Sequence, residues 1–242
     1  MLRKLILLVL ISLGLSAQAT HMSGGEIYWD CIGPNQFRIT MVIYRDCAGI
    51  TVDPSYTLQV QSPCGNTTLV VSTPGGQEIS QLCDLELPNS TCNGGSLPGI
   101  QQYIYTGTIT LPPCNYWTIS YTNIYRNNAI VNLQNPGAQR TYIRATLNNA
   151  VSPCNDSPQF TNTAIPFVCM GYPITYSFGA FDPEGDSLSY TLIDAMGING
   201  AALNYVNPYT GNEPIPGLTL DAATGEVNFI LNVQGNWVVV VQ

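Results

Sequence analysis

Short runs of alternating apolar and polar residues, separated by glycine- and proline-rich turns, constrain the fold of this 242-residue chain more than any other feature. The clearest runs are residues 37–44, 56–61, 103–111, 117–125 and 142–147. A period of two residues places one face of a strand on a core and the other face in water. No stretch shows the sustained 3.6-residue period of a capped helix. The pattern therefore predicts an all-β protein, built as a sandwich or a partly open barrel.

Residues 1–19 have the pattern of a secretory signal peptide. Arg3 and Lys4 are followed by the apolar run 5–15 and then by the small-x-small sequence 17–19, so Thr20 is the expected first mature residue. The apolar run is roughly 11 residues long, whereas a transmembrane helix needs about 20, so we expect cleavage and not anchoring. The sequence thus predicts a secreted or cell-surface protein with no membrane span of its own.

The charge balance narrows the possible partners. Beyond residue 19 the chain has five Arg and no Lys against 15 acidic residues, a formal charge of −10. Such a surface repels phosphate backbones and anionic membranes, so nucleic acid is excluded as an expected partner. The balance suits divalent cations and contact with an extracellular protein or glycan surface.

Eight cysteines follow the predicted cleavage site: Cys31, Cys47, Cys64, Cys83, Cys92, Cys114, Cys154 and Cys169. An even number in an exported chain favours disulfides, and the alternative, a metal site, lacks both Cys-x-x-Cys pairs and nearby His ligands. Sequence alone leaves the connectivity open. Local pairing would give Cys31–Cys47, Cys83–Cys92 and Cys154–Cys169, each closing a loop of about 10 to 16 residues and contributing about 3 kcal/mol.

A composition change near residue 150 predicts two mature domains. Residues 20–150 would form a cysteine-rich β domain. Residues 151–242 would form a second β domain of about 90 residues, the size of an immunoglobulin-like sandwich. Its expected strands are 174–178, 188–193, 217–220, 226–231 and 236–241. Because the apolar run 237–241 continues almost to Gln242, we expect this second domain to be truncated and the chain to be the N-terminal piece of a longer protein.

One acidic turn is the candidate metal site. Asp182, Glu184 and Asp186 alternate within five residues, and crowded carboxylates are held together most easily by a hard cation such as calcium. Further ligands would have to come from Asp156 or Asp221. The alternative is a solvated turn, because Asp-Pro and Glu-Gly favour turns without any metal.

Two blocks of the second domain carry a family resemblance. Residues 180–191, with the acidic turn before the sequence Leu188-Ser189-Tyr190, and residues 216–227, with Asp221 and the Thr224-Gly225 turn, resemble cadherin-like domains of the dystroglycan type. The resemblance implies tandem immunoglobulin-like β-sandwiches, adhesion and calcium binding. The chain lacks the Asp-x-Asn-Asp-Asn linker string of classical cadherins, so interdomain calcium of that style is not expected. Asp221 is expected to cap its own turn.

A second resemblance lies in the N-terminal part. Residues 20–27 and the sequence Tyr44-Arg45-Asp46-Cys47 resemble the start of large secreted surface proteins of gliding Bacteroidetes that use type IX secretion. This resemblance implies export to the outer surface and adhesion.

Catalysis is not expected from these residues. The chain has a single histidine, His21, near the mature N-terminus, so it has no base for a Ser or Cys nucleophile. The function expected is therefore structural or adhesive. The alternative is a carbohydrate-binding module, in which the pairs Tyr28-Trp29 and Tyr116-Trp117 would stack on sugar rings, although strand alternation also explains these aromatic residues as core packing.

Overall fold

The computed structural model describes residues 22–163 and 167–242, and these residues form an all-β protein, as predicted. The predicted signal peptide and His21 lie outside the described residues. Helical backbone in the described part is limited to four 3-10 turns: η1 (Leu87–Asn89), η2 (Thr91–Asn93), η3 (Pro136–Ala138) and η4 (Ile198–Gly200).

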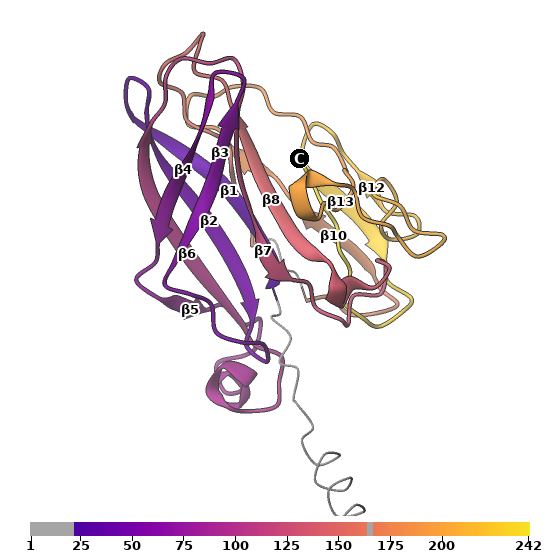
Figure 1. Ribbon diagram of the computed structural model, residues 1–242. Coiled ribbons are helices and arrows are strands. Elements are labelled where there is room, and N and C mark those ends of the chain that lie inside the picture. Colours follow the sequence, from indigo (N-terminus) through magenta and orange to yellow (C-terminus); the bar gives the residue numbers. More distant parts are fainter. Residues whose placement is uncertain (1–21, 164–166) are drawn as a thin grey trace, which may run out of the picture.

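The larger sheet contains eight strands: β1 (Met22–Gly33), β2 (Gln36–Asp46), β3 (Ser55–Ser62), β4 (Gly65–Ser72), β5 (Gly76–Glu78), β6 (Ile100–Thr110), β7 (Trp117–Tyr125) and β8 (Arg140–Leu147). Neighbours pair antiparallel in the order β1-β2-β6-β4-β3-β7-β8, with β5 on the edge of β6. The sheet curls until β8 contacts β1, and Met22 forms a bridge with Arg126 beyond β7 (Figure 1). The result is a barrel-like body.

Alternation along the strands fills this barrel. In β2 the side chains of Phe37, Ile39, Met41 and Ile43 point inward and are almost completely buried, and they pack with inward residues of the other strands. The alternate positions of β2 point outward. Tyr44 occupies one of them and is also buried, because a second small cluster covers that face. From Ile39 to Arg45, β2 is thus buried on both faces, which explains the continuous apolar run Met41–Tyr44 within it.

The second part of the chain is less regular. It contains β9 (Gln159–Phe160), β10 (Pro173–Ser177), β11 (Ala180–Phe181), β12 (Thr219–Leu220) and β13 (Glu226–Ile230). One sheet has the order β10-β13-β12, and β9 pairs with β11. The expected strands 188–193 and 236–241 meet through a bridge between Leu192 and Val241 and through backbone hydrogen bonds. These antiparallel segments pack around a core that includes Ile215, Leu218 and Val227.

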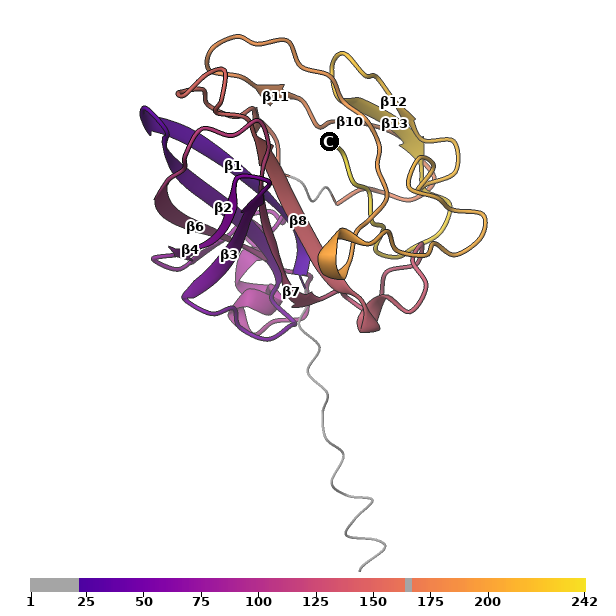
Figure 2. The ribbon, with the colours of Figure 1, turned by 45° about the horizontal axis from the view of Figure 1, so that its top comes forward.

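The loop between β7 and β8 extends from the barrel into this second part (Figure 2). Asn132 is fully buried there: its Nδ2 donates to the carbonyls of Pro214 and Val238, and its Oδ1 accepts the Val238 N–H at 3.0 Å. Arg126 donates to the Met196 carbonyl at 3.0 Å. The contacts of this loop cross the predicted boundary at residue 150, so the two parts share a hydrogen-bonded junction.

Candidate functional site

The disulfides differ from the predicted local pairs. Six cysteines form the bridges Cys31–Cys154, Cys47–Cys92 and Cys64–Cys114. Cys83 and Cys169 have free, exposed thiols. The predictions Cys31–Cys47, Cys83–Cys92 and Cys154–Cys169 are therefore wrong, although disulfide bonding itself is confirmed for six of the eight residues.

Strand geometry explains the error. Cys31 lies opposite Phe37 in the β1–β2 hairpin, whereas Cys47 follows the other end of β2. Ten residues of extended strand separate Phe37 from Cys47, which is about 33 Å at ~3.3 Å per residue. A disulfide needs Cα atoms within about 7 Å, so two cysteines close in sequence cannot pair when a hairpin holds them at opposite ends.

The Cys31–Cys154 bridge encloses the other two. It joins residues 123 positions apart, and both Cys47–Cys92 and Cys64–Cys114 lie inside that loop. The chain therefore leaves the barrel at a point that is covalently tied to the end of β1. The part of the chain beyond Cys154 is tied to β1 through the disulfide and to β8 through the backbone.

Residues 154–159, which we term the strap, run along the free edge of β1. Trp29 and Ser157 exchange backbone and hydroxyl hydrogen bonds, and the Trp29 indole N–H donates to the carbonyl of Asn155 at 3.0 Å. The Cys31 N–H donates to Asp156 Oδ1. An open strand edge is an aggregation hazard, and the strap covers this one with hydrogen bonds beside the disulfide.

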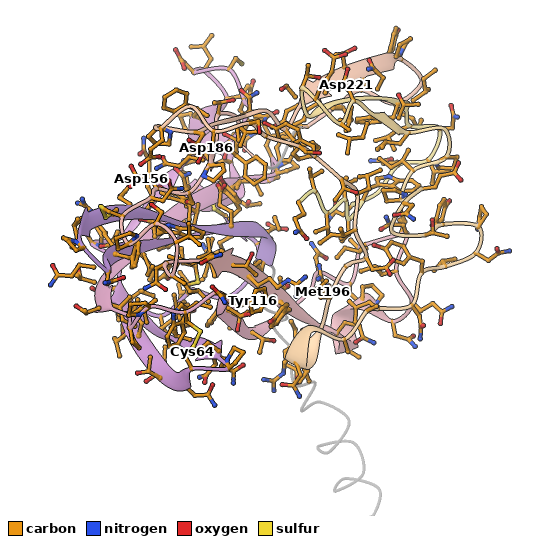
Figure 3. All side chains as sticks on the ribbon, turned by 90° about the horizontal axis from the view of Figure 1, so that it is seen from above. Cys64, Tyr116, Asp156, Asp186, Met196 and Asp221 are labelled. Atoms are coloured by element: carbon orange, nitrogen blue, oxygen red, sulfur yellow. A yellow bond between two sulfur atoms is a disulfide. The ribbon has the colours of Figure 1, made fainter. Side chains whose placement is uncertain are left out.

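The acidic turn lies against the strap. Asp182 Oδ1 accepts the N–H groups of Glu184 and Asp186 at 3.1 and 3.0 Å, and Asp182 is buried. Glu184 Oε1 accepts the N–H of Asp156 at 3.1 Å. Asp156 and Asp186 lie on the same side of the molecule, and Asp221 lies far from them (Figure 3). Of the two predicted additional ligands, the structure thus brings Asp156 to the turn, and the contact is made by the Asp156 backbone N–H.

The carboxylates of Asp182 and Glu184 are engaged with N–H donors, as expected for a self-capped turn. Among the residues that the structure describes, no group of three or more His, Cys, Asp or Glu side chains is arranged to hold a metal. The geometry favours the plain turn, and calcium binding at Asp182, Glu184 and Asp186 stays a prediction. Asp221 caps its own turn by accepting the N–H groups of Ala223 and Thr224, and these bonds lower its pKa.

The predicted aromatic pairs are divided between core and surface. Trp29 and Trp117 are buried, and each indole N–H donates to a backbone carbonyl. Their neighbours Tyr28 and Tyr116 point the other way, because adjacent residues of extended backbone face opposite sides. Neither pair can present two rings to one ligand.

A shallow groove of about 190 Å³ lies between the outer face of β1, β2 and β6 and residues 159–163. Glu26, Tyr28 and Gln102 line it, and the Tyr44 hydroxyl donates to Glu26 Oε1 at 2.9 Å. Burial raises the pKa of Glu26, and the Tyr44 hydrogen bond only partly offsets this effect. Burial also raises the pKa of Tyr28, and the nearby Glu26 carboxylate raises it further. The groove therefore combines an aromatic ring, a carboxyl group and an amide.

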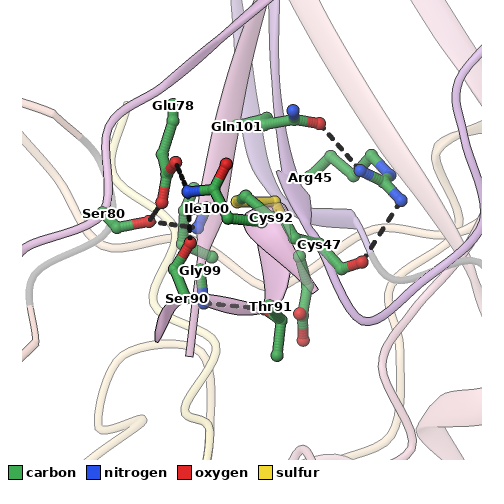
Figure 4. The surroundings of a disulfide bond; sticks show 12 residues. Arg45, Cys47, Glu78, Ser80, Ser90, Thr91, Cys92, Gly99, Ile100 and Gln101 are labelled. Carbon is green, nitrogen blue, oxygen red and sulfur yellow. Dashed lines mark hydrogen bonds between the residues drawn. A yellow bond between two sulfur atoms is a disulfide. The ribbon is translucent and has the colours of Figure 1, made fainter. Parts of the chain in front are cut away.

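The Cys47–Cys92 bridge fixes the irregular segment 79–99 to the end of the barrel (Figure 4). Arg45 is buried beside it and donates to the carbonyls of Cys47 and Gly49 and to Gln101 Oε1. Glu78 accepts from Ser80 and Asn93, and hydroxyl and amide donors lower its pKa. Two hydrogen-bonded groups, one around Arg45 and one around Glu78, thus lie beside this bridge.

Sequence reasoning missed the buried asparagines that hold the loops. Asn132 joins the two parts of the chain. Asn149 donates to the carbonyls of Leu111 and Pro112 and accepts the Cys114 N–H. Both residues lie in polar, turn-rich stretches that look solvent-exposed in sequence, so no local signal distinguishes them.

Comparison with known proteins adds no relative: no protein-family model, curated protein or solved structure matches the chain. In the described ranges, no helix has the length and apolarity needed to cross a bilayer. The three disulfides indicate an oxidising environment.

Proposed function

We propose that the protein is a secreted or cell-surface structural and adhesive module that transmits mechanical load between its two parts. The observation that supports this proposal is the Cys31–Cys154 bridge, which closes the barrel at one point and lies beside the strap. The predicted signal peptide and the acidic, lysine-free composition beyond it agree with a position outside the cell.

The mechanical argument follows from the connectivity. A pull on residues beyond Cys154 acts on β8 through the backbone and on β1 through the disulfide at the same time. β1 and β8 are the first and last strands in the sheet order, and they lie side by side. With Cys31 and Cys154 linked, a load that enters through residues beyond Cys154 bypasses the chain between the two cysteines, including β8. The hydrogen bonds of the strap and of Asn132 have to break before the parts separate.

Attachment under flow tests this proposal. Beads carrying the mature chain, fixed through its C-terminus, are brought onto surfaces coated with extracellular proteins or polysaccharides. Wild-type beads are expected to stay attached at higher shear than beads with Cys31→Ala/Cys154→Ala, although both attach equally at rest. Val151→Ala, an exposed change near the strap, is the matched control. Wild-type beads that attach no better than bare beads, or that detach at the same shear as the double variant, would refute the proposal.

The groove favours a second candidate function, recognition of a sugar unit. Tyr28 offers a ring for stacking, and the Glu26 carboxyl and Gln102 amide offer hydrogen-bond partners for hydroxyl groups. A glycan array probed with the mature chain tests this candidate. Binding that Tyr28→Ala abolishes and Tyr116→Ala leaves intact would support it, because Tyr116 is exposed but lies outside the groove. Absence of binding to every glycan would remove it.

A further inference from the structure

The two remaining cysteines share features that place them together. All eight cysteines lie in the described part of the chain, and only Cys83 and Cys169 are outside the three bridges. Both thiols are exposed, in a protein whose other bridges indicate an oxidising environment. Exposed thiols in such an environment are readily oxidised.

A direct contact joins the segments that carry them. The N–H of Phe167 donates to Oε1 of Gln81 at 2.9 Å, across 86 positions of sequence. Cys83 follows Gln81 by two residues, and Cys169 follows Phe167 by two residues. Residues 79–99 and 167–172 are largely irregular backbone, so the thiols can approach without breaking the hydrogen-bond ladder of a sheet.

The surroundings of the cysteines support the same pairing. Leu85 is 91% exposed and Met170 is 54% exposed, and each lies within two residues of one of the thiols. Large apolar side chains gain free energy when they leave water. Closing the two segments on each other would cover both side chains.

We infer that Cys83 and Cys169 form a fourth disulfide, which ties the 79–99 segment of the barrel to the second part of the chain. In the first step, one thiolate attacks an oxidised disulfide such as glutathione disulfide, which forms a mixed disulfide and releases one glutathione thiol. In the second step, the other thiolate attacks the mixed disulfide and releases the second glutathione thiol. The two cysteines lose two protons and two electrons, and the glutathione disulfide accepts them. This inference is independent of the adhesive role and of the groove.

Cleavage at acidic residues separates the relevant peptides. Cutting after Glu and before Asp gives residues 79–83 and 156–181, which contain Cys83 and Cys169 as their only cysteines. The exported chain is alkylated without reduction, denatured, digested and analysed by mass spectrometry. The inference predicts a linked peptide about 2 Da lighter than the sum of the two free-thiol peptides. It also predicts that Cys83→Ser makes Cys169 reactive to the alkylating reagent.

Two results would overturn the inference. The first is alkylation of both cysteines in the wild-type protein after exposure to glutathione disulfide. The second is a covalent dimer on non-reducing electrophoresis that is lost in Cys83→Ser or Cys169→Ser, because exposed thiols would then pair between molecules.

Discussion

Removal of the Cys31–Cys154 bridge by Cys31→Ala/Cys154→Ala tests whether this bond determines the stability of the fold. In a Cys83→Ser background, which lacks the inferred fourth disulfide, the shortest covalent path runs from Cys31 to Cys64, across to Cys114 and on to Cys154. The bridge thus closes a loop of roughly 73 residues, and the chain-entropy relation gives about 4 kcal/mol for a loop of that length. The strap keeps its hydrogen bonds in the variant, so this value concerns the covalent link alone.

Thermal and urea unfolding measure this loss. For a chain of this size, about 4 kcal/mol corresponds to a fall in Tm of roughly 8 to 16 °C. Val151→Ala, an exposed substitution near the strap, is expected to change stability by less than about 0.5 kcal/mol. A loss below about 1 kcal/mol in the double variant would show that the bridge adds little to the strap and would refute the reasoning.

Three further predictions concern single residues. Glu26→Gln should stabilise the protein at neutral pH and have little effect below pH 4.5, because folding raises the Glu26 pKa above 4.5 and the wild type therefore loses stability as pH rises past that value. Urea unfolding at two pH values should show a gain of about 1.4 kcal/mol for each unit by which the Glu26 pKa is raised. Equal gains at both pH values would contradict this prediction. Asn132→Leu should lower the free energy of unfolding by about 3 kcal/mol, since it leaves buried backbone groups of Pro214 and Val238 unpaired. Gln134→Ala, an exposed substitution in the same loop, should lower it by about 0.5 kcal/mol in the same assay. Similar losses in the two variants would contradict the role of Asn132. Asp182→Ala should cost about 1 to 2 kcal/mol in the same unfolding assay, because the N–H groups of Glu184 and Asp186 lose their acceptor, and an unchanged stability would contradict this role; millimolar calcium tests the predicted metal site, which a rise in Tm of the wild type alone would support and an unchanged Tm of the wild type would remove.

The sequence predicted the strands that supply most of the buried apolar side chains. The predicted run 117–125 coincides with β7, and 37–44 lies within β2, because side chains on one face enter the core. β1 was missed because Gly24, Gly25 and polar residues interrupt its pattern. Gly25 is needed in β1, since a Cβ there would lie 2.7 Å from the Val42 carbonyl oxygen. Such a close approach between strands depends on a partner that the local sequence does not identify.

The disulfide connectivity and the hydrogen-bonded junction between the two parts could not be predicted from local sequence either. Both depend on which strand ends meet after the sheet closes, and the order β1-β2-β6-β4-β3-β7-β8 is set by pairing between distant segments. In the acidic turn, composition predicts the crowding of the carboxylates but not their hydrogen-bond partners. Its carboxylates are close in sequence, as a calcium loop requires, but the structure uses Asp182 and Glu184 to accept backbone N–H groups.

Single-molecule extension between handles at residue 22 and residue 242 tests the load-bearing account most directly. In the oxidised protein, only residues outside the 31–154 loop should lengthen. In a Cys83→Ser background, which lacks the inferred fourth disulfide, Cys31→Ala/Cys154→Ala should release about 250 Å more, the length of roughly 73 residues at ~3.4 Å each. Full reduction should release about 420 Å more than the oxidised wild type, from the 123 positions between Cys31 and Cys154. Equal extension of the oxidised wild type and the double variant would contradict the account.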